Sequence, residues 1–218
     1  MPRILVLVAI ILLVFPTATA LAGDSGTQPA ESSGSAMEGY LDADQRRELL
    51  HLLGTSAKGV IEAVSTLDDA GWSFKPSPES WSVGEVMEHL FMVEKGLGGQ
   101  VRGAAETPAD PQWSSKTTGK TESIRALLPD RSQKFQAPEP VQPQGEMSRR
   151  GVMQGFIETR HETMAFVRES KTPMLAHTFE SQAFGPINMR QGYLILALHN
   201  ARHLQQIEEV MANPDFPR

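Results

Sequence analysis

The stretch NMRQGYLILALHNARHLQQIEEVMA, residues 188–212, has the pattern of one long, largely buried α-helix. Its apolar residues recur at intervals of three and four, which places them on one side of a helix. Asn188 with Gln191 three residues later is typical of a helix start, and Asn213-Pro214 is typical of a helix end. The stretch therefore predicts the last helix of a helical fold.

Three other stretches predict long helices. The first runs from about Ala43 to Asp69, and the third from about Arg149 to Ser170, each with apolar residues at helical spacing. The second begins in WSVGEVMEHL, residues 81–90, where Ser82 and Glu85 fit a capping box. Its flanking apolar residues are placed to form a hydrophobic staple: Trp81 and Val86.

The segments between these helices have no convincing strand alternation. Residues 104–147 are rich in proline and read as a long crossover, with a short helix near residues 121–128. The segment HTFESQAFGPIN, residues 177–188, reads as a loop. The expected fold is therefore all-α: a four-helix bundle with a long crossover.

Two histidines interrupt the apolar face of the last helix. They belong to a row of residues four apart: Ile195, His199, His203 and Ile207. Burying an unpaired polar group costs roughly 1–3 kcal/mol. A divalent ion removes this cost, because it binds neutral imidazole nitrogens at about 2 Å. His89 lies on the inward face of the second helix, so His89, His199 and His203 form a candidate metal site with open coordination positions.

The alternative is that each ring is an ordinary buried histidine with a local hydrogen bond. The remaining histidines are set apart from the site: His51 and His161 are expected at the surface, and His177 lies in the predicted loop. Glu85 and Gln206 are candidates to orient the ligand rings. The favoured role of Glu85 is nevertheless that of the capping-box acid, and the favoured role of Gln206 is that of an amide at the edge of the core. Asn200 follows His199 where zinc proteases carry a glutamate, which disfavours that route of peptide hydrolysis.

The amino terminus has the features of an export signal. Arg3 is followed by the apolar run ILVLVAIILLVF and by small residues that allow cleavage after Ala20 or Ala22. The run is shorter than the roughly 20 residues that span a bilayer, which favours a cleaved signal over the alternative of an uncleaved anchor. We therefore expect a signal peptide at residues 1–22, a flexible linker at 23–38, a helical domain at 39–213 and a periplasmic or extracellular location.

Composition limits the chemistry and the partners. The 218 residues include no cysteine, so a metal site must use histidine and carboxylate ligands. Zinc or nickel is the first expectation, with iron or manganese as alternatives. The formal net charge of −6 argues against nucleic acid. We expect a small-molecule substrate and no stable membrane anchor after signal cleavage, and a homodimer is left open.

Two motifs resemble the DinB-like (DinB/YfiT) superfamily of metal-binding four-helix bundles. The first has Trp81, Ser82, Glu85, His89 and Leu90, and the second has Phe184, Gly185, His199, His203, Gln206 and Ile207. The resemblance spans roughly residues 40–212. It implies an up-up-down-down bundle with a divalent metal on His89, His199 and His203.

Relatives in this superfamily include thiol transferases and thiol-dependent isomerases. The resemblance thus implies a metal-dependent hydrolase or group transferase, in which the ion lowers the pKa of a water or a substrate heteroatom. No residue is assigned as catalytic. The alternative is a non-catalytic exported module in which a metal is structural or the bundle binds a partner or metal.

Overall fold

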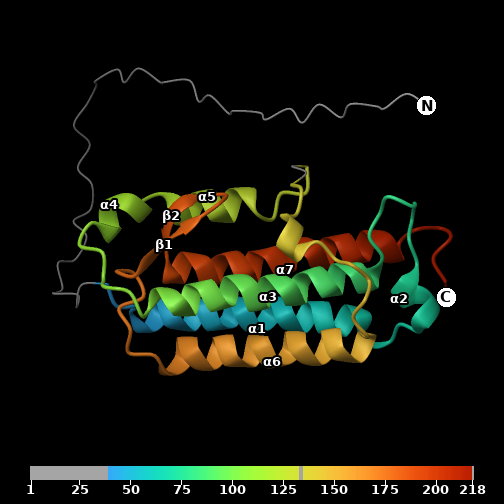
Figure 1. The fold of residues 1–218 in the computed structure, drawn as a ribbon, viewed down its shortest axis with the longest axis horizontal. Coiled ribbons are helices and arrows are strands. Elements are labelled where there is room, and N and C mark those ends of the chain that lie inside the picture. The colour runs from blue at the N-terminus through green and yellow to red at the C-terminus, as the bar shows by residue number, and fades with distance from the viewer. Residues whose placement is uncertain (1–38, 133–134, 218) are drawn as a thin grey trace, which may run out of the picture. The chain divides into compact units, whose positions relative to one another are not determined.

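A computed structural model describes residues 39–132 and 135–217 of the chain. The predicted signal peptide and linker lie outside the described residues. Four long helices form the body of this part, as Figure 1 shows. They are α1 (Ala43–Ser65), α3 (Val83–Ala104), α6 (Arg149–Glu169) and α7 (Met189–Met211).

Each long helix packs against two of the others. Helix α1 lies beside α7 and α6, and α3 also lies beside α7 and α6, which closes a four-helix bundle. Helices α1 and α7 run in one direction, and α3 and α6 run in the opposite direction (Figure 1). The all-α bundle with a long crossover is therefore confirmed.

The order of helix directions needs a correction. Around the bundle, α1, α7, α3 and α6 run up, up, down and down, but in chain order the directions are up, down, down and up. The reason is the length of the connections. Residues 66–82 reverse the chain between α1 and α3, whereas α3 and α6 are parallel and need the long crossover to bring the chain back.

Local capping explains where the helices begin. Capping boxes start α1 at Asp42 and Gln45, α3 at Ser82 and Glu85, and α7 at Asn188 and Gln191. The starts predicted at Ser82 and Asn188 are thus confirmed. Helix α1 ends at Ser65, earlier than the predicted Asp69, because Asp68 caps a separate short helix, α2 (Asp69–Ser73).

The connections contain more structure than the sequence predicted. The crossover holds α4 (Trp113–Thr117), α5 (Lys120–Leu127) and the 3₁₀ turn η1 (Glu139–Val141). Before α7, strands β1 (Thr178–Ser181) and β2 (Gly185–Asn188) pair as an antiparallel hairpin, where a loop was predicted. Two strands of four residues are too short to show clear alternation. Gly185, the first residue of β2, has a φ of +66°, a left-handed backbone conformation that favours glycine.

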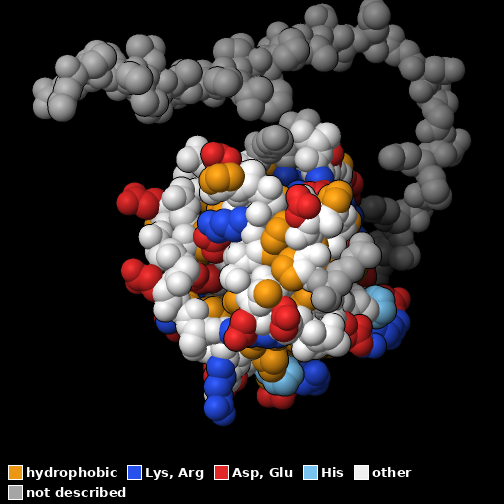
Figure 2. Space-filling model, turned by 90° about the vertical axis from the view of Figure 1, so that its right-hand side faces the viewer, with side chains coloured by type: hydrophobic (Ala, Val, Ile, Leu, Met, Phe, Trp, Pro, Cys, Tyr) orange, Lys and Arg blue, Asp and Glu red, His pale blue; other side chains and the backbone are white. Residues whose placement is uncertain are grey.

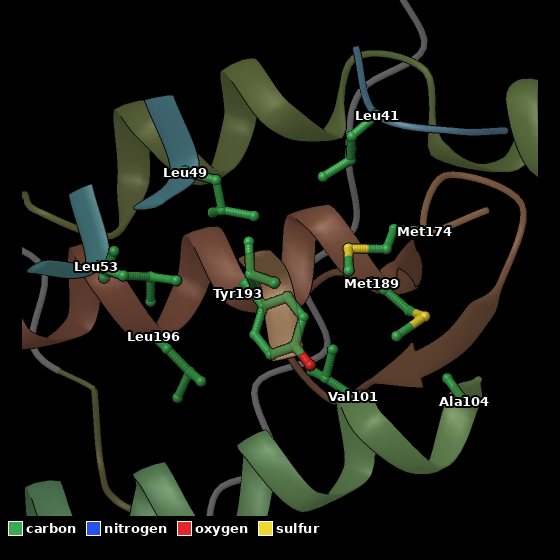
Figure 3. Packing of buried hydrophobic residues seen from close by; sticks show 11 residues of the cluster. Leu41, Leu49, Leu53, Val101, Ala104, Met174, Met189, Tyr193 and Leu196 are labelled. Atoms are coloured by element: carbon green, nitrogen blue, oxygen red, sulfur yellow. The ribbon is translucent and has the colours of Figure 1, made fainter. Parts of the chain in front are cut away.

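Interdigitating aliphatic and aromatic side chains fill the bundle. Figure 3 shows one end of this core, where the Tyr193 ring of α7 lies among residues from several elements: Leu49, Leu53, Val101, Met174, Met189 and Leu196. These side chains are nearly or fully excluded from solvent. Apolar burial of this kind stabilises a fold by roughly 25 cal/mol per Å².

One ion pair is buried inside the bundle. The Arg160 guanidinium on α6 binds the Glu94 carboxylate on α3, with Nε 3.2 Å from Oε2, and both side chains are almost fully buried. Arg160 also donates to the Leu53 carbonyl oxygen on α1 at 2.5 Å. Burial raises the pKa of the Glu94 carboxyl, and Arg160 opposes that rise. The pair therefore joins three helices through charged hydrogen bonds.

The end of the bundle near α2 has a mixed surface. Figure 2 shows acidic and basic side chains interspersed with hydrophobic ones on this face. None of the described helices is long and apolar enough to cross a membrane.

Candidate metal centre

Three histidines from two helices meet inside the bundle. His89 comes from α3, and His199 and His203 come from successive turns of α7. The Nε2 atom of His199 lies 3.2 Å from that of His89 and 3.1 Å from that of His203. One ring nitrogen from each residue lies within 4.8 Å of the other two. Nitrogens bound at about 2.0–2.1 Å to a tetrahedral ion would be about 3.3 Å apart, so the spacing fits a shared ion.

Hydrogen bonds on the far side of two rings fix the inward nitrogens as acceptors. His89 Nδ1 lies 2.6 Å from the carbonyl oxygen of Val141, which can only accept, so this nitrogen donates. His203 Nδ1 lies 2.8 Å from Gln206 Oε1 and donates in the same way. Neutral rings with hydrogen on Nδ1 carry a lone pair on Nε2. Both lone pairs therefore point toward His199.

The three inward nitrogens cannot satisfy one another. A neutral His199 can donate at most one hydrogen from Nε2, so at least one close pair of nitrogens sets lone pair against lone pair. Among the described residues, His199 Nδ1 is buried and has no hydrogen-bond partner. A cation among the three nitrogens removes this conflict, so the donor set fits a divalent metal.

Burial keeps the rings in the form that binds metal. It is the largest cause of the lowered pKa of all three, and it takes the pKa of His203 to about 3. A buried imidazole loses hydration that its charged form needs, so neutral rings are favoured. Each ring can thus offer a lone pair at neutral pH.

The crossover completes the surroundings of His89. The Glu88 carboxylate, buried beside His89, accepts from the backbone N–H groups of Gln144 at 3.3 Å and Gly145 at 2.8 Å. These bonds hold residues 141–145 of the crossover in place, and the Val141 carbonyl group in this segment orients the His89 ring. The sequence reasoning missed Glu88 and Val141, because neither bond follows from local spacing. A buried acid directly before a ligand histidine was the one available signal.

The two candidates for orienting the rings have different positions. Gln206 accepts the hydrogen bond from His203 Nδ1, so it holds a ligand ring and is more than an amide at the edge of the core. Glu85 instead accepts from the Ser82 backbone N–H at 2.8 Å and pairs with Lys75 at 2.7 Å. These contacts support the favoured role of Glu85 as a capping acid.

Trp81 covers the cluster from the start of α3. Its ring centroid lies 5.0 Å from that of His89, and it stacks against His203 at 6.5 Å. Trp81 also packs in the same apolar cluster as Val86, as expected for the staple. The residue that fixes the entry to α3 therefore also shields the histidines.

The remaining histidines stay apart from the cluster. His51 and His161 are exposed, as predicted. His177 is buried, and its Nδ1 pairs with the carbonyl oxygen of Ala104 at 3.0 Å. Arg160, the residue directly before the exposed His161, is itself buried as the partner of Glu94.

The three histidines open into a large cavity. Its volume is about 1610 Å³, and its lining includes all three rings, Trp81 and Arg202. Arg202 donates to the backbone carbonyl oxygens of Leu128 at 3.3 Å and of Asp130, so α7 holds the crossover beside the cavity. A cluster that meets such a cavity leaves room for a small molecule next to the ligand nitrogens.

Fold and site together define a class: helical bundles with three inward histidines suited to a divalent metal. A family model described as the DinB superfamily matches residues 52–207. The chain therefore belongs to the DinB superfamily. No curated protein matches it.

One solved structure is similar in fold. YfiT from Bacillus subtilis is described as a probable metal-dependent hydrolase with an unusual four-helix bundle topology. It aligns with a TM-score of 0.50 and 12% identity, over 85% of this chain and 91% of YfiT. At this identity the likeness concerns the fold.

Proposed function

We propose that the protein is an exported, metal-dependent hydrolase or group transferase that acts on a small molecule. The observation that carries the proposal is the convergence of His89, His199 and His203 at the wall of a large cavity. A bound divalent ion supplies Lewis acidity, which lowers the pKa of a water or a substrate heteroatom. Zinc or nickel suits three imidazole ligands.

The surrounding residues have roles that do not depend on the ion's identity. Val141 and Gln206 keep hydrogen on the outer nitrogens, so the inner ones stay free to bind. Trp81 limits the access of water to the rings from one side. The Arg202 guanidinium lines the same cavity and favours negative charge that develops on a substrate.

Access to the cavity favours catalysis over a purely structural metal. A structural site is closed by four protein ligands, whereas three histidines beside a cavity leave a position for substrate. Export would separate the chain from cytosolic thiol cofactors. We therefore expect hydrolysis rather than thiol transfer from such cofactors.

Metal analysis of the purified protein tests the proposal. Wild-type protein should hold about one divalent ion per chain, and His203→Ala should hold close to none. His161→Ala, at an exposed site outside the cluster, should keep the wild-type content. If wild-type protein binds no zinc, nickel, iron or manganese even when they are added, the proposal is wrong.

A further inference from the structure

Gly96, on helix α3, has no packing reason to be glycine. A glycine inside a helix is unfavourable relative to alanine. Gly96, Gly99 and Gly103 of α3 all leave open space where a side chain would stand, and of these three only Gly96 lines the cavity beside the histidines. At Gly155, for comparison, an added Cβ would come within 2.6 Å of the Phe91 ring, which explains the small residue. At Gly96, an added Cβ would meet no atom of the described residues within 4 Å. The missing side chain leaves open space.

That open space belongs to the cavity beside the histidines. Gly96 lines it together with Val93 and Leu97, the neighbours on the same wall of α3. From His89 to Gln100 this wall is about 16 Å long, at 1.5 Å per helical residue. The same cavity is lined by Ile195 of α7 and Phe184 of the hairpin turn, which pack in one apolar cluster with Leu97. We call the part of the cavity along Val93–Gln100 the α3 arm.

The walls of the α3 arm carry no charge and are mainly apolar, with polar side chains at Gln100, Ser181 and Gln182. Among the described lining residues, α3 and the hairpin turn contribute no charged side chain, and neither does α7 before His199. The charged lining residues lie elsewhere, on the later part of α7, in the crossover and before α3: Glu79, Arg131, Glu139, Arg202 and Glu209. The arm offers an ionised group no oppositely charged partner among the described lining residues, whereas Val93, Leu97 and Phe184 offer apolar contact, so the arm suits an uncharged ligand.

We propose, building on the proposed function, that the α3 arm binds the uncharged, mainly apolar tail of the substrate. The substrate class is then an elongated neutral amphiphile. Its reactive polar group lies at the histidines, and its alkyl or aryl tail of up to about 16 Å follows α3 past Gly96. Gln100, at the far end of the wall, donates from Nε2 to the carbonyl oxygen of Glu180 at 3.2 Å, so its Oε1 is the atom that accepts a hydrogen bond from a tail that reaches it.

Hydroxamates of different chain length test this assignment on the full-length, zinc-loaded protein. Octanohydroxamate should bind at least about tenfold more tightly than acetohydroxamate, because each buried methylene strengthens binding severalfold. Gly96→Leu should reduce this advantage, and Gly96→Phe should abolish it. Both variants should keep the zinc content and the affinity for acetohydroxamate.

Gly103→Leu and Gly103→Phe are the matched controls. Gly103 is on the same helix, does not line the cavity, and an added Cβ there also meets nothing within 4 Å. These variants should keep the full chain-length advantage. Equal affinity of wild-type protein for the two hydroxamates would overturn the assignment, and so would an unchanged advantage in Gly96→Phe.

A metal-free measurement separates this inference from the proposed function. The neutral dye N-phenylnaphthylamine should bind metal-free protein, and Gly96→Phe should weaken that binding at least about tenfold relative to Gly103→Phe. If zinc fails to bind while the dye discriminates the variants, the metal proposal is wrong and the apolar arm stands. If zinc binds and the dye does not discriminate them, the arm is wrong and the metal proposal stands.

Discussion

At the residue scale, the site depends on which nitrogen of each ring carries hydrogen. Val141 fixes this for His89 and Gln206 fixes it for His203, each through a bond to Nδ1. His199 has no such partner among the described residues, so its ring is oriented by packing between the other two. The most informative substitutions therefore change the outer partners and leave the ligands intact.

Replacing Gln206 should weaken metal binding without removing a ligand. Gln206→Leu deletes the acceptor for His203 Nδ1, and the loss of such a partner typically costs about 10–100-fold in metal affinity. Competition with a chelator measures the affinity. Gln205→Leu, at an exposed neighbouring position, should keep the wild-type value. Equal affinity in both variants would show that Gln206 has no orienting role.

The lowered pKa values of the three histidines predict how stability depends on pH in the metal-free protein. The unfolded chain takes up protons below about pH 6.5, whereas the buried His203 ring, with a pKa of about 3, does not. The stability that the neutral ring contributes is thus present above pH 6.5 and lost as the pH falls toward 3. The buried Glu94 carboxyl, with its raised pKa, acts in the opposite sense.

Urea unfolding of metal-free protein between pH 7 and 5 measures this slope. Wild-type protein should lose free energy of unfolding as the pH falls, with each buried ring contributing up to about 1.4 kcal/mol per pH unit. His203→Gln should have the shallower slope, whatever its absolute stability. A slope that is identical in the two proteins would contradict the burial of a neutral His203.

At the element scale, the crossover is part of the site. Glu88 holds the Gln144 and Gly145 backbone while Val141, from the same segment, orients His89. Gly145 has a φ of +71°, a conformation that favours glycine, so the segment is shaped for this turn. The crossover segment is therefore held by Glu88 of α3 and in turn orients the ring of His89, the next residue of the same helix.

Removing the Glu88 carboxylate should loosen this segment and the site together. Glu88→Ala deletes the side-chain acceptor of two backbone N–H groups, in residues exposed enough for water to replace it, so the segment loses its attachment to α3. We expect faster hydrogen exchange at Gln144 and Gly145, together with about tenfold weaker zinc binding. Glu146→Ala, an exposed acid in the same segment, is the control. Unchanged exchange and affinity in Glu88→Ala would contradict the anchoring role.

At the scale of the whole molecule, the bundle combines an apolar core with one buried charged network. Arg160 reaches from α6 to Glu94 on α3 and to the Leu53 carbonyl oxygen on α1. Such a pair adds little net stability over apolar packing, but each partner becomes costly once the other is removed. Its geometric effect is to fix how three helices meet next to the metal centre.

The response to substitution of this pair should be strongly non-additive. Arg160→Met should destabilise the fold by about 3–5 kcal/mol, because Glu94 is left buried without its partner. Adding Glu94→Leu should recover a large part of that loss. Arg47→Met removes an exposed pair with Asp44 and should change stability by less than about 1 kcal/mol. Denaturant unfolding measures all four proteins, and a double variant less stable than Arg160→Met would contradict the network.

The sequence by itself determined the helices and the inward position of the histidines. Apolar spacing and caps such as Ser82 with Glu85 are local signals, and a separation of four residues puts His199 and His203 on one face whatever surrounds them. Tertiary structure decided the helix directions in chain order, the hairpin before α7, the burial of Arg160 and the partners of His89. Val141 lies 52 residues from His89, and Arg160 lies 66 residues from Glu94. Contacts at such distances along the chain form only when the whole core packs, so no local pattern encodes them.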